Sequence, residues 1–337
     1  MKWANSHRLN LRVGEIVEVR SKEEILSTLD CNGKIDGLPF MPEMFRFCGL
    51  RFRVYKRADR TCDTITHGGM RRMHDAVHLE GLRCDGSFHG GCQAACFLFW
   101  KEPWLKRASR RGGESDPVRK IGLCTETKLL QATHAARCSS EAGEIFSCQA
   151  TELPRATTRL TAWDIRPYLR DIWSGNLSVK EAVIAVFWRA FRTSRTVGAY
   201  RLQIWLYNKI QQVRRRELFP YPYPWGELRK TPCLQLNLQP GNVVKVRSYK
   251  EITSTLDTAF RNRGLSFDVE MTKYCDGTYK VLQRVERVIN EQTGEMMKLP
   301  RDCLILEQVT CKGDYHWGCP RSLYPFWREI WLERVDQ

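Results

Sequence analysis

Short alternations of apolar and polar residues near both ends of the chain are each followed by a helix-start signal. Residues 16–20 and 243–247 alternate in the manner of half-buried strands. A Ser-x-x-Glu capping box begins directly after each alternation, at Ser21 and at Ser248, so a short helix is expected there. Further strands are predicted at 52–55, 77–82 and 279–282, and the Phe-Trp-x-Glu-x-Trp-Leu segments at 99–105 and 326–332 predict a strand or a short helix.

These signals recur because a long stretch of the chain is repeated. Residues 14–107 align with residues 241–334 without a gap, at a constant shift of 227, and 36 of the 94 aligned positions are identical. A duplicated unit of this size predicts a duplicated fold. We therefore expect an α+β protein with two homologous, small, β-rich and barrel-like zinc-knuckle modules. The opening of each module resembles the first strand of an SH3-like barrel, over fewer than twenty residues.

The part between the modules changes character along the chain. Residues 109–123 are polar and glycine-rich, Asp164 is placed to cap a helix, and the sequence from Phe219 to Gly226 alternates proline with aromatic residues. We therefore divide the chain into an N-terminal tail (1–13), a first module (14–108), a linker and β-hairpin (109–163), a basic helical segment (164–217), a Pro/aromatic spacer (218–236) and a second module (237–337).

Three cysteines and one histidine of each module are identical in the alignment and keep their spacing. They are Cys48, Cys84, His89 and Cys92 in the first module, and Cys275, Cys311, His316 and Cys319 in the second. The other cysteines of the aligned region are not kept. Three thiolates and one imidazole suit tetrahedral Zn²⁺ in a closed structural site, so two zinc ions are predicted.

Other uses of these residues remain open. A Cys₃His set also holds [2Fe–2S] clusters, and "CDGSFH" at 84–89 resembles the Cys-Asp-Gly-Ser-His string of the CDGSH iron–sulfur family. Here the histidine comes one residue later, an upstream Cys-x-Cys pair is absent, and the second module reads "CKGDYH". Disulfides, or buried thiols with a core histidine, are the remaining alternatives.

Additional cysteines complicate the first module and the region that follows it. Cys96 faces Leu323 in the alignment, so it is either a ligand that replaces Cys48 or a free thiol. A further group with new spacing is formed by Cys124, His134, Cys138 and Cys148. These residues are interpreted as a third metal site or as thiols in the core of a hairpin between Leu129 and Thr151.

The net charge of +16 favours anionic partners: nucleic acid, an acidic protein or an anionic membrane surface. The cations concentrate in the helical segment, at Arg189, Arg192, Arg195, Arg201, Lys209, Arg214, Arg215 and Arg216. Interleaved aromatic residues there are typical of phosphate neutralisation with base stacking, although a solvated arginine face explains the same pattern. The sequence has no 18-residue apolar run and no secretory h-region, so a cytoplasmic protein with reduced cysteines is expected.

No P-loop, dinucleotide fingerprint, G-x-S-x-G or H-E-x-x-H motif occurs, which disfavours the common enzyme classes. Four acids are retained in both modules and are expected in caps and salt bridges; the alternatives are a general acid or base and a position behind a ligand histidine. They are Asp30/Asp257, Glu43/Glu270, Glu80/Glu307 and Glu102/Glu329. The sequence thus favours a zinc-stabilised binding or adaptor protein for an anionic polymer or an acidic partner. The alternatives are a metal- or thiol-dependent enzyme with its active site in the first module, and a membrane-surface or protein scaffold.

Overall fold

The structure is a computed structural model in which two compact units are distinguished. It describes residues 8–66, 69–108, 122, 124–134, 144–161, 164, 166–178, 205–206, 208–209, 212–213, 226–300, 302–314, 316 and 318–335. Unit 1 comprises Met1–Val179, Arg287–Lys298 and Cys319–Arg321, and unit 2 comprises Lys180–Glu286, Leu299–Gly318 and Ser322–Gln337. Two short segments of the second module therefore belong to unit 1.

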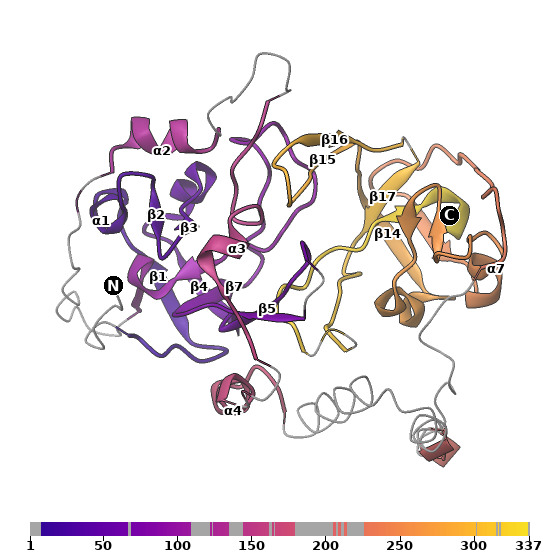
Figure 1. Cartoon of the computed structure of the whole chain (residues 1–337), viewed down its shortest axis with the longest axis horizontal. Helices are drawn as coiled ribbons and strands as arrows, with labels where there is room; N and C mark the ends of the chain where they lie inside the picture. Colours follow the sequence, from indigo (N-terminus) through magenta and orange to yellow (C-terminus); the bar gives the residue numbers. More distant parts are fainter. Residues whose placement is uncertain are drawn as a thin grey trace. The chain divides into compact units, whose positions relative to one another are not determined.

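Unit 1 is built on an antiparallel sheet with the order β8-β7-β4-β1-β9, of which Figure 1 labels β1, β4 and β7. Its strands are β1 (Ile16–Val19), β4 (Arg51–Arg57), β7 (Ala76–Leu79), β8 (Trp100–Lys101) and β9 (Leu105–Arg107). In β1, Val17 and Val19 are fully buried while Ile16 is exposed, as the alternation predicts. Among the described strands β8 and β9 are the edges and do not pair with each other, so the sheet is open and the barrel-like expectation is wrong.

Helix α1 and two 3₁₀ helices connect strands of this sheet. Helix α1 (Lys22–Thr28) starts at the predicted capping box, in which the Ser21 side chain and the Glu24 side chain each accept the other residue's backbone N–H. The 3₁₀ helices are η2 (Pro42–Phe47) and η3 (Glu102–Trp104). The Phe-Trp-x-Glu-x-Trp-Leu segment thus forms strand, 3₁₀ turn and strand in succession.

Large aromatic side chains form part of the core of unit 1. Trp100 and Trp104 are fully buried, and Phe40 packs edge-on against Trp104 with ring centroids 5.1 Å apart. Edge-to-face pairs of this kind stabilise a core beyond the apolar area that they bury. They fix the ends of β8 and η3 against the segment that leads into η2.

Smaller elements complete unit 1. They are β2 (Lys34–Ile35), β3 (Leu38–Pro39), β5 (Arg60–Cys62), β6 (Met70–Arg72), α2 (Glu126–Ala132), α3 (Leu153–Ala156), β10 (Thr158–Arg159), α4 (Arg166–Ser174), β15 (Arg287–Ile289) and β16 (Met296–Lys298). Helix α4 follows Asp164, as predicted. The hairpin predicted from Leu129 is wrong at its start, because Leu129 lies in helix α2. The Thr125 side chain caps this helix by accepting the Lys128 N–H. An isolated antiparallel bridge, His134 to Phe146, remains of the predicted hairpin.

Unit 2 has a second five-stranded sheet in a similar arrangement, β18-β17-β14-β11-β19. Its elements are β11 (Val243–Val246), α7 (Tyr249–Thr253), β12 (Arg261–Asn262), β13 (Leu265–Ser266), η4 (Val269–Tyr274), β14 (Thr278–Arg284), β17 (Cys303–Leu306), β18 (Trp327–Arg328), η5 (Glu329–Trp331) and β19 (Leu332–Arg334). The register also corresponds: Val17 faces Phe52 in unit 1, and Val244 faces Tyr279 in unit 2.

A buried ion pair holds the N-terminal segment of each module to its sheet. The Glu102 carboxylate accepts the N–H groups of Asn10 and Leu11 and lies 2.7 Å from the Arg57 guanidinium. Glu329 contacts Arg284 at the same distance in unit 2. These retained acids are structural, as expected. None of the described helices has the length and apolar character needed to cross a membrane.

Candidate metal centres

The sulfur and imidazole donors of each module come from one sharp loop that follows the central strands. In the first module the N–H of His89 and the N–H of Gly91 both donate to the Gly86 carbonyl, at 3.1 and 2.9 Å. The N–H of Cys84 donates to the Cys96 carbonyl at 2.8 Å. These bonds bring residues five apart in the sequence to the same side of the loop.

The second module repeats this backbone pattern. His316 and Gly318 donate to the Gly313 carbonyl at 3.2 and 2.7 Å, and Cys311 donates to the Leu323 carbonyl at 2.8 Å. Leu323 therefore occupies the place that Cys96 has in the first module. The loop is a property of the repeated sequence, and the cysteine at this place is not.

Gly86 is required by both its backbone angle and its surroundings. Its φ is +74°, and a Cβ there would lie 2.2 Å from the Cys92 carbonyl oxygen. Gly81 has nearly the same φ, +75°, with no atom within 4 Å of such a Cβ.

We expect Gly86→Ala to destabilise the fold by about 3 kcal/mol, and Gly81→Ala by about 1 kcal/mol, because only the first adds a clash to the backbone strain. Urea unfolding of both variants measures the difference. Equal losses of stability would show that the contact between the new Cβ and the Cys92 carbonyl oxygen costs no free energy of unfolding.

The first candidate centre joins Cys84 and His89 to Glu43, which η2 carries. Their ligand atoms all lie within 4.8 Å of one another. The Cys84 Sγ is 3.2 Å from His89 Nε2 and 3.6 Å from Glu43 Oε1, and His89 Nδ1 is 3.6 Å from the same oxygen. Glu43 and His89 are buried, and Glu43 Oε2 and His89 Nδ1 have no hydrogen-bond partner. Unpartnered polar atoms of this kind are costly, and a bound cation would satisfy them.

Burial drives all three groups toward their neutral forms. Desolvation raises the pKa of Glu43 to about 7, raises the pKa of the Cys84 thiol well above its usual value, and lowers the pKa of His89 to about 4. A metal ion reverses this preference for the thiol and the carboxyl, because its positive charge stabilises thiolate and carboxylate.

The second candidate centre has the equivalent residues Glu270, Cys311 and His316, whose ligand atoms are also within 4.8 Å of one another. Here charged neighbours contact the group. Lys273 lies 3.1 Å from the Glu270 carboxylate, and His316 Nε2 lies 3.4 Å from the Asp268 carboxylate. The carboxylate and the imidazole of this group thus have charged neighbours within 3.4 Å.

The structure brings together two of the four predicted ligands of each module. Cys48 and Cys275 end η2 and η4 as their C-caps and are not members of the close groups. The sulfur of Cys92 accepts the Ile289 N–H at 3.4 Å, and the sulfur of Cys319 accepts the Cys62 N–H at 3.2 Å. The Cys₃His quartets therefore stay predictions.

Glu43 and Glu270 replace the missing ligands in the close groups. Both were recognisable in the sequence as acids kept by the repeat, and one of the roles expected for such acids was a position behind a ligand histidine. The structure instead makes them full members of the donor set.

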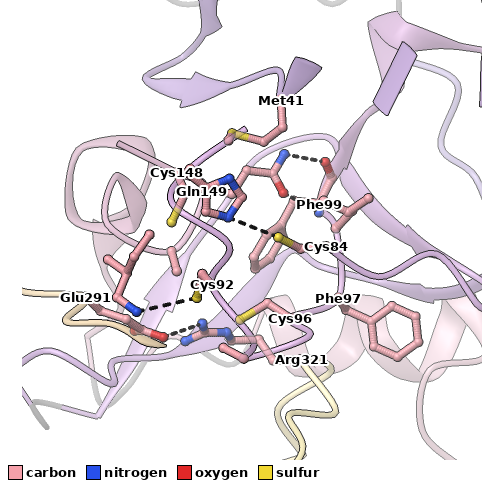
Figure 2. Close-up of a pocket in the computed structure, with 15 residues that line it drawn as sticks. Met41, Cys84, Cys92, Cys96, Phe97, Phe99, Cys148, Gln149, Glu291 and Arg321 are labelled. Atoms are coloured by element: carbon pink, nitrogen blue, oxygen red, sulfur yellow. Dashed lines mark hydrogen bonds and ion pairs between the residues drawn. The ribbon is translucent and has the colours of Figure 1, made fainter. Parts of the chain in front are cut away.

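A pocket adjoins the first centre in unit 1, with a volume of about 40 Å³ (Figure 2). Its lining includes the side chains of Cys84, His89, Cys92, Cys96 and Cys148. Cys148 comes from outside the repeat. Such a volume exceeds what one water molecule requires.

The third predicted metal group is not assembled among its described members. Cys124 contacts the Thr125 carbonyl, His134 packs against the Phe146 ring, and Cys148 lines the pocket of the first centre. Cys138 lies outside the described residues.

Of the predicted anion-binding residues, only Lys209 is described, and it is exposed. The others lie outside the described residues: Arg189, Arg192, Arg195, Arg201, Arg214, Arg215 and Arg216. The anionic partner stays a prediction, which salt-dependent binding to DNA and RNA tests.

Comparison of the chain with protein-family models, with curated proteins and with solved structures gives no match.

Proposed function

We propose that this chain is a tandem metal-binding protein, with one metal centre in each module. The observation that supports it is the same Glu, Cys and His donor set, with all ligand atoms within 4.8 Å of one another, at repeat-equivalent positions in two separate units. One thiolate, one imidazole and one carboxylate are all ligands of Zn²⁺. We assign Zn²⁺ to the second module, where Glu270, Cys311 and His316 make up the close group.

A thiol nucleophile activated by histidine is the competing use of the same residues. It requires a thiolate beside a base that takes its proton. In the first module burial instead raises the pKa of Cys84 and lowers the pKa of its histidine partner, so the pair remains neutral without a metal. The duplication of the whole triad also fits a ligand set better than a single active site.

The number of donors bears on what a metal does in these centres. Structural zinc sites have four protein ligands, whereas sites with three protein ligands keep a position for water or substrate. The close groups contain three donors each. The triads therefore favour centres that bind an additional ligand over the closed structural sites expected from the sequence.

Metal analysis of the purified full-length protein tests the proposal. The second module is expected to hold one zinc ion, which Glu270→Gln removes or weakens because the neutral amide is a poor Zn²⁺ ligand. The matched control is Glu307→Gln, which changes another retained acid of the same module outside the triad. A wild-type protein without any bound metal, purified without chelator and after incubation with Zn²⁺, would contradict the proposal.

A further inference from the structure

Four cysteine sulfurs surround the pocket beside the first centre. They belong to Cys84, Cys92, Cys96 and Cys148, which all line this pocket and are labelled in Figure 2. The backbone sets the positions of three of them. The Cys84 N–H donates a hydrogen bond to the Cys96 carbonyl, and Gly86, which has no Cβ, lets the Cys92 backbone pack directly against it.

A buried glutamine holds Cys148 in the wall of this pocket. The Gln149 side chain accepts the Phe99 N–H at 2.8 Å and donates to the carbonyls of Pro39 and Phe99 at 3.1 and 2.9 Å. These bonds anchor the chain beside Cys148 to the end of the sheet. A segment outside the repeat thus contributes the fourth sulfur of the group.

The spacing of these sulfurs does not suit one metal ion. Four thiolates at about 2.3 Å from a tetrahedral Zn²⁺ lie about 3.8 Å from one another. Within the described part of the chain, only the two Glu-Cys-His triads have three or more ligand atoms within 4.8 Å of one another. No three of the four sulfurs are that close. The four cysteines therefore line one pocket without forming a mononuclear group.

We propose that Cys84, Cys92, Cys96 and Cys148 hold an iron–sulfur cluster in the first module. Four cysteines are the usual ligands of [2Fe–2S] and [4Fe–4S] clusters. The inference rests on the proposed function in one respect, since it makes Cys84 a metal ligand. It gives the first module a redox centre that the second lacks, because Leu323 replaces Cys96 there and the aligned region ends before Cys148.

The surroundings of the four thiols support a cluster. Cys96 and Cys148 are enclosed by the protein, and this burial raises the pKa of Cys96 to about 12 and that of Cys148 to about 11. The buried guanidinium of Arg321 also lines the pocket, where it pairs with the Glu291 carboxylate at 3.2 Å. His89 Nε2, 3.2 Å from the Cys84 sulfur, is placed to hydrogen bond a cluster ligand, an interaction that tunes reduction potentials.

Anaerobic reconstitution of the full chain with ferrous iron, sulfide and a thiol reductant tests the cluster. We expect visible sulfur-to-iron absorption, equal amounts of iron and sulfide, and two or four iron atoms per chain according to the cluster type. Cys96→Leu, which introduces the residue of the second module, and Cys148→Ala should each lose at least nine-tenths of the iron.

Two control variants separate the cluster from a mononuclear site. Cys31→Thr alters an exposed cysteine to the residue of the second module and should keep all iron. Glu43→Gln removes a donor of the triad, so loss of metal in this variant, with metal kept in Cys96→Leu and Cys148→Ala, would place a single ion in the triad. Circular dichroism of each variant shows whether it is folded.

The outcomes distinguish failure of the cluster from failure of the metal proposal. One colourless zinc ion in the first module, retained in folded Cys96→Leu and Cys148→Ala but lost in Glu43→Gln, would overturn the cluster and keep the metal-binding function. Absence of metal from both modules would overturn both.

Discussion

Cys84→Ala is expected to remove the metal of the first module, and Cys311→Ala that of the second. Each cysteine is a member of its triad, and Cys84 is also a wall of the sulfur-lined pocket. Because a metal that binds only the folded state adds its binding free energy to stability, each variant should also unfold more easily. The loss is about 4 kcal/mol when the free metal exceeds its dissociation constant a thousandfold.

Elemental analysis and denaturant unfolding of the two single variants and the double variant measure this effect. The double variant should hold no metal, and a chelator should no longer change its stability. Cys31→Ala is the control, because Cys31 is exposed and belongs to neither close group. Undiminished metal in both single variants would remove these cysteines from the ligand sets.

Glu102→Ala is expected to destabilise unit 1 by about 3–5 kcal/mol, the range for breaking a buried ion pair by removing one partner. The substitution leaves the buried Arg57 guanidinium with Asp59 as its carboxylate partner, and it leaves the N–H groups of Asn10 and Leu11 without their acceptor. Glu102→Gln keeps an acceptor and should lose less.

Urea unfolding tests this second prediction, with Glu80→Ala as control. Glu80 is also retained in both modules, but its side chain is 64% exposed and lies 3.6 Å from Arg53. Removing an exposed pair of this kind costs less than about 1 kcal/mol. Similar losses of stability for the two variants would contradict the prediction, because they would show that burial does not decide how much a retained acid contributes to stability.

The two modules differ in the polar partners of their triad residues. In the first, Glu43 and His89 are buried with unpartnered atoms. In the second, Lys273 and Asp268 contact the equivalent residues, and the His316 side chain is 37% exposed. A triad that already has charged partners gains less from a cation, so we expect the second triad to hold a cation less tightly than the first.

The sequence by itself determined the local elements and the first two donors of each centre. Helix starts at Ser21 and Ser248 follow from the capping-box spacing, which acts within one turn and needs no distant contact. Cys84 and His89 are five residues apart in one glycine-containing loop, so their proximity is also local. The same holds for their counterparts in the second module.

The remaining donors were decided by the tertiary structure. Residues three apart share a face of a 3₁₀ helix, so Glu43 and Cys48, five apart, do not, and the fold directs the glutamate inward. Cys148 reaches the pocket because Gln149 binds the chain to Pro39 and Phe99, positions far away in the sequence. Spacing along the chain carries no information about such side-chain directions or long-range contacts, which only the packed core defines.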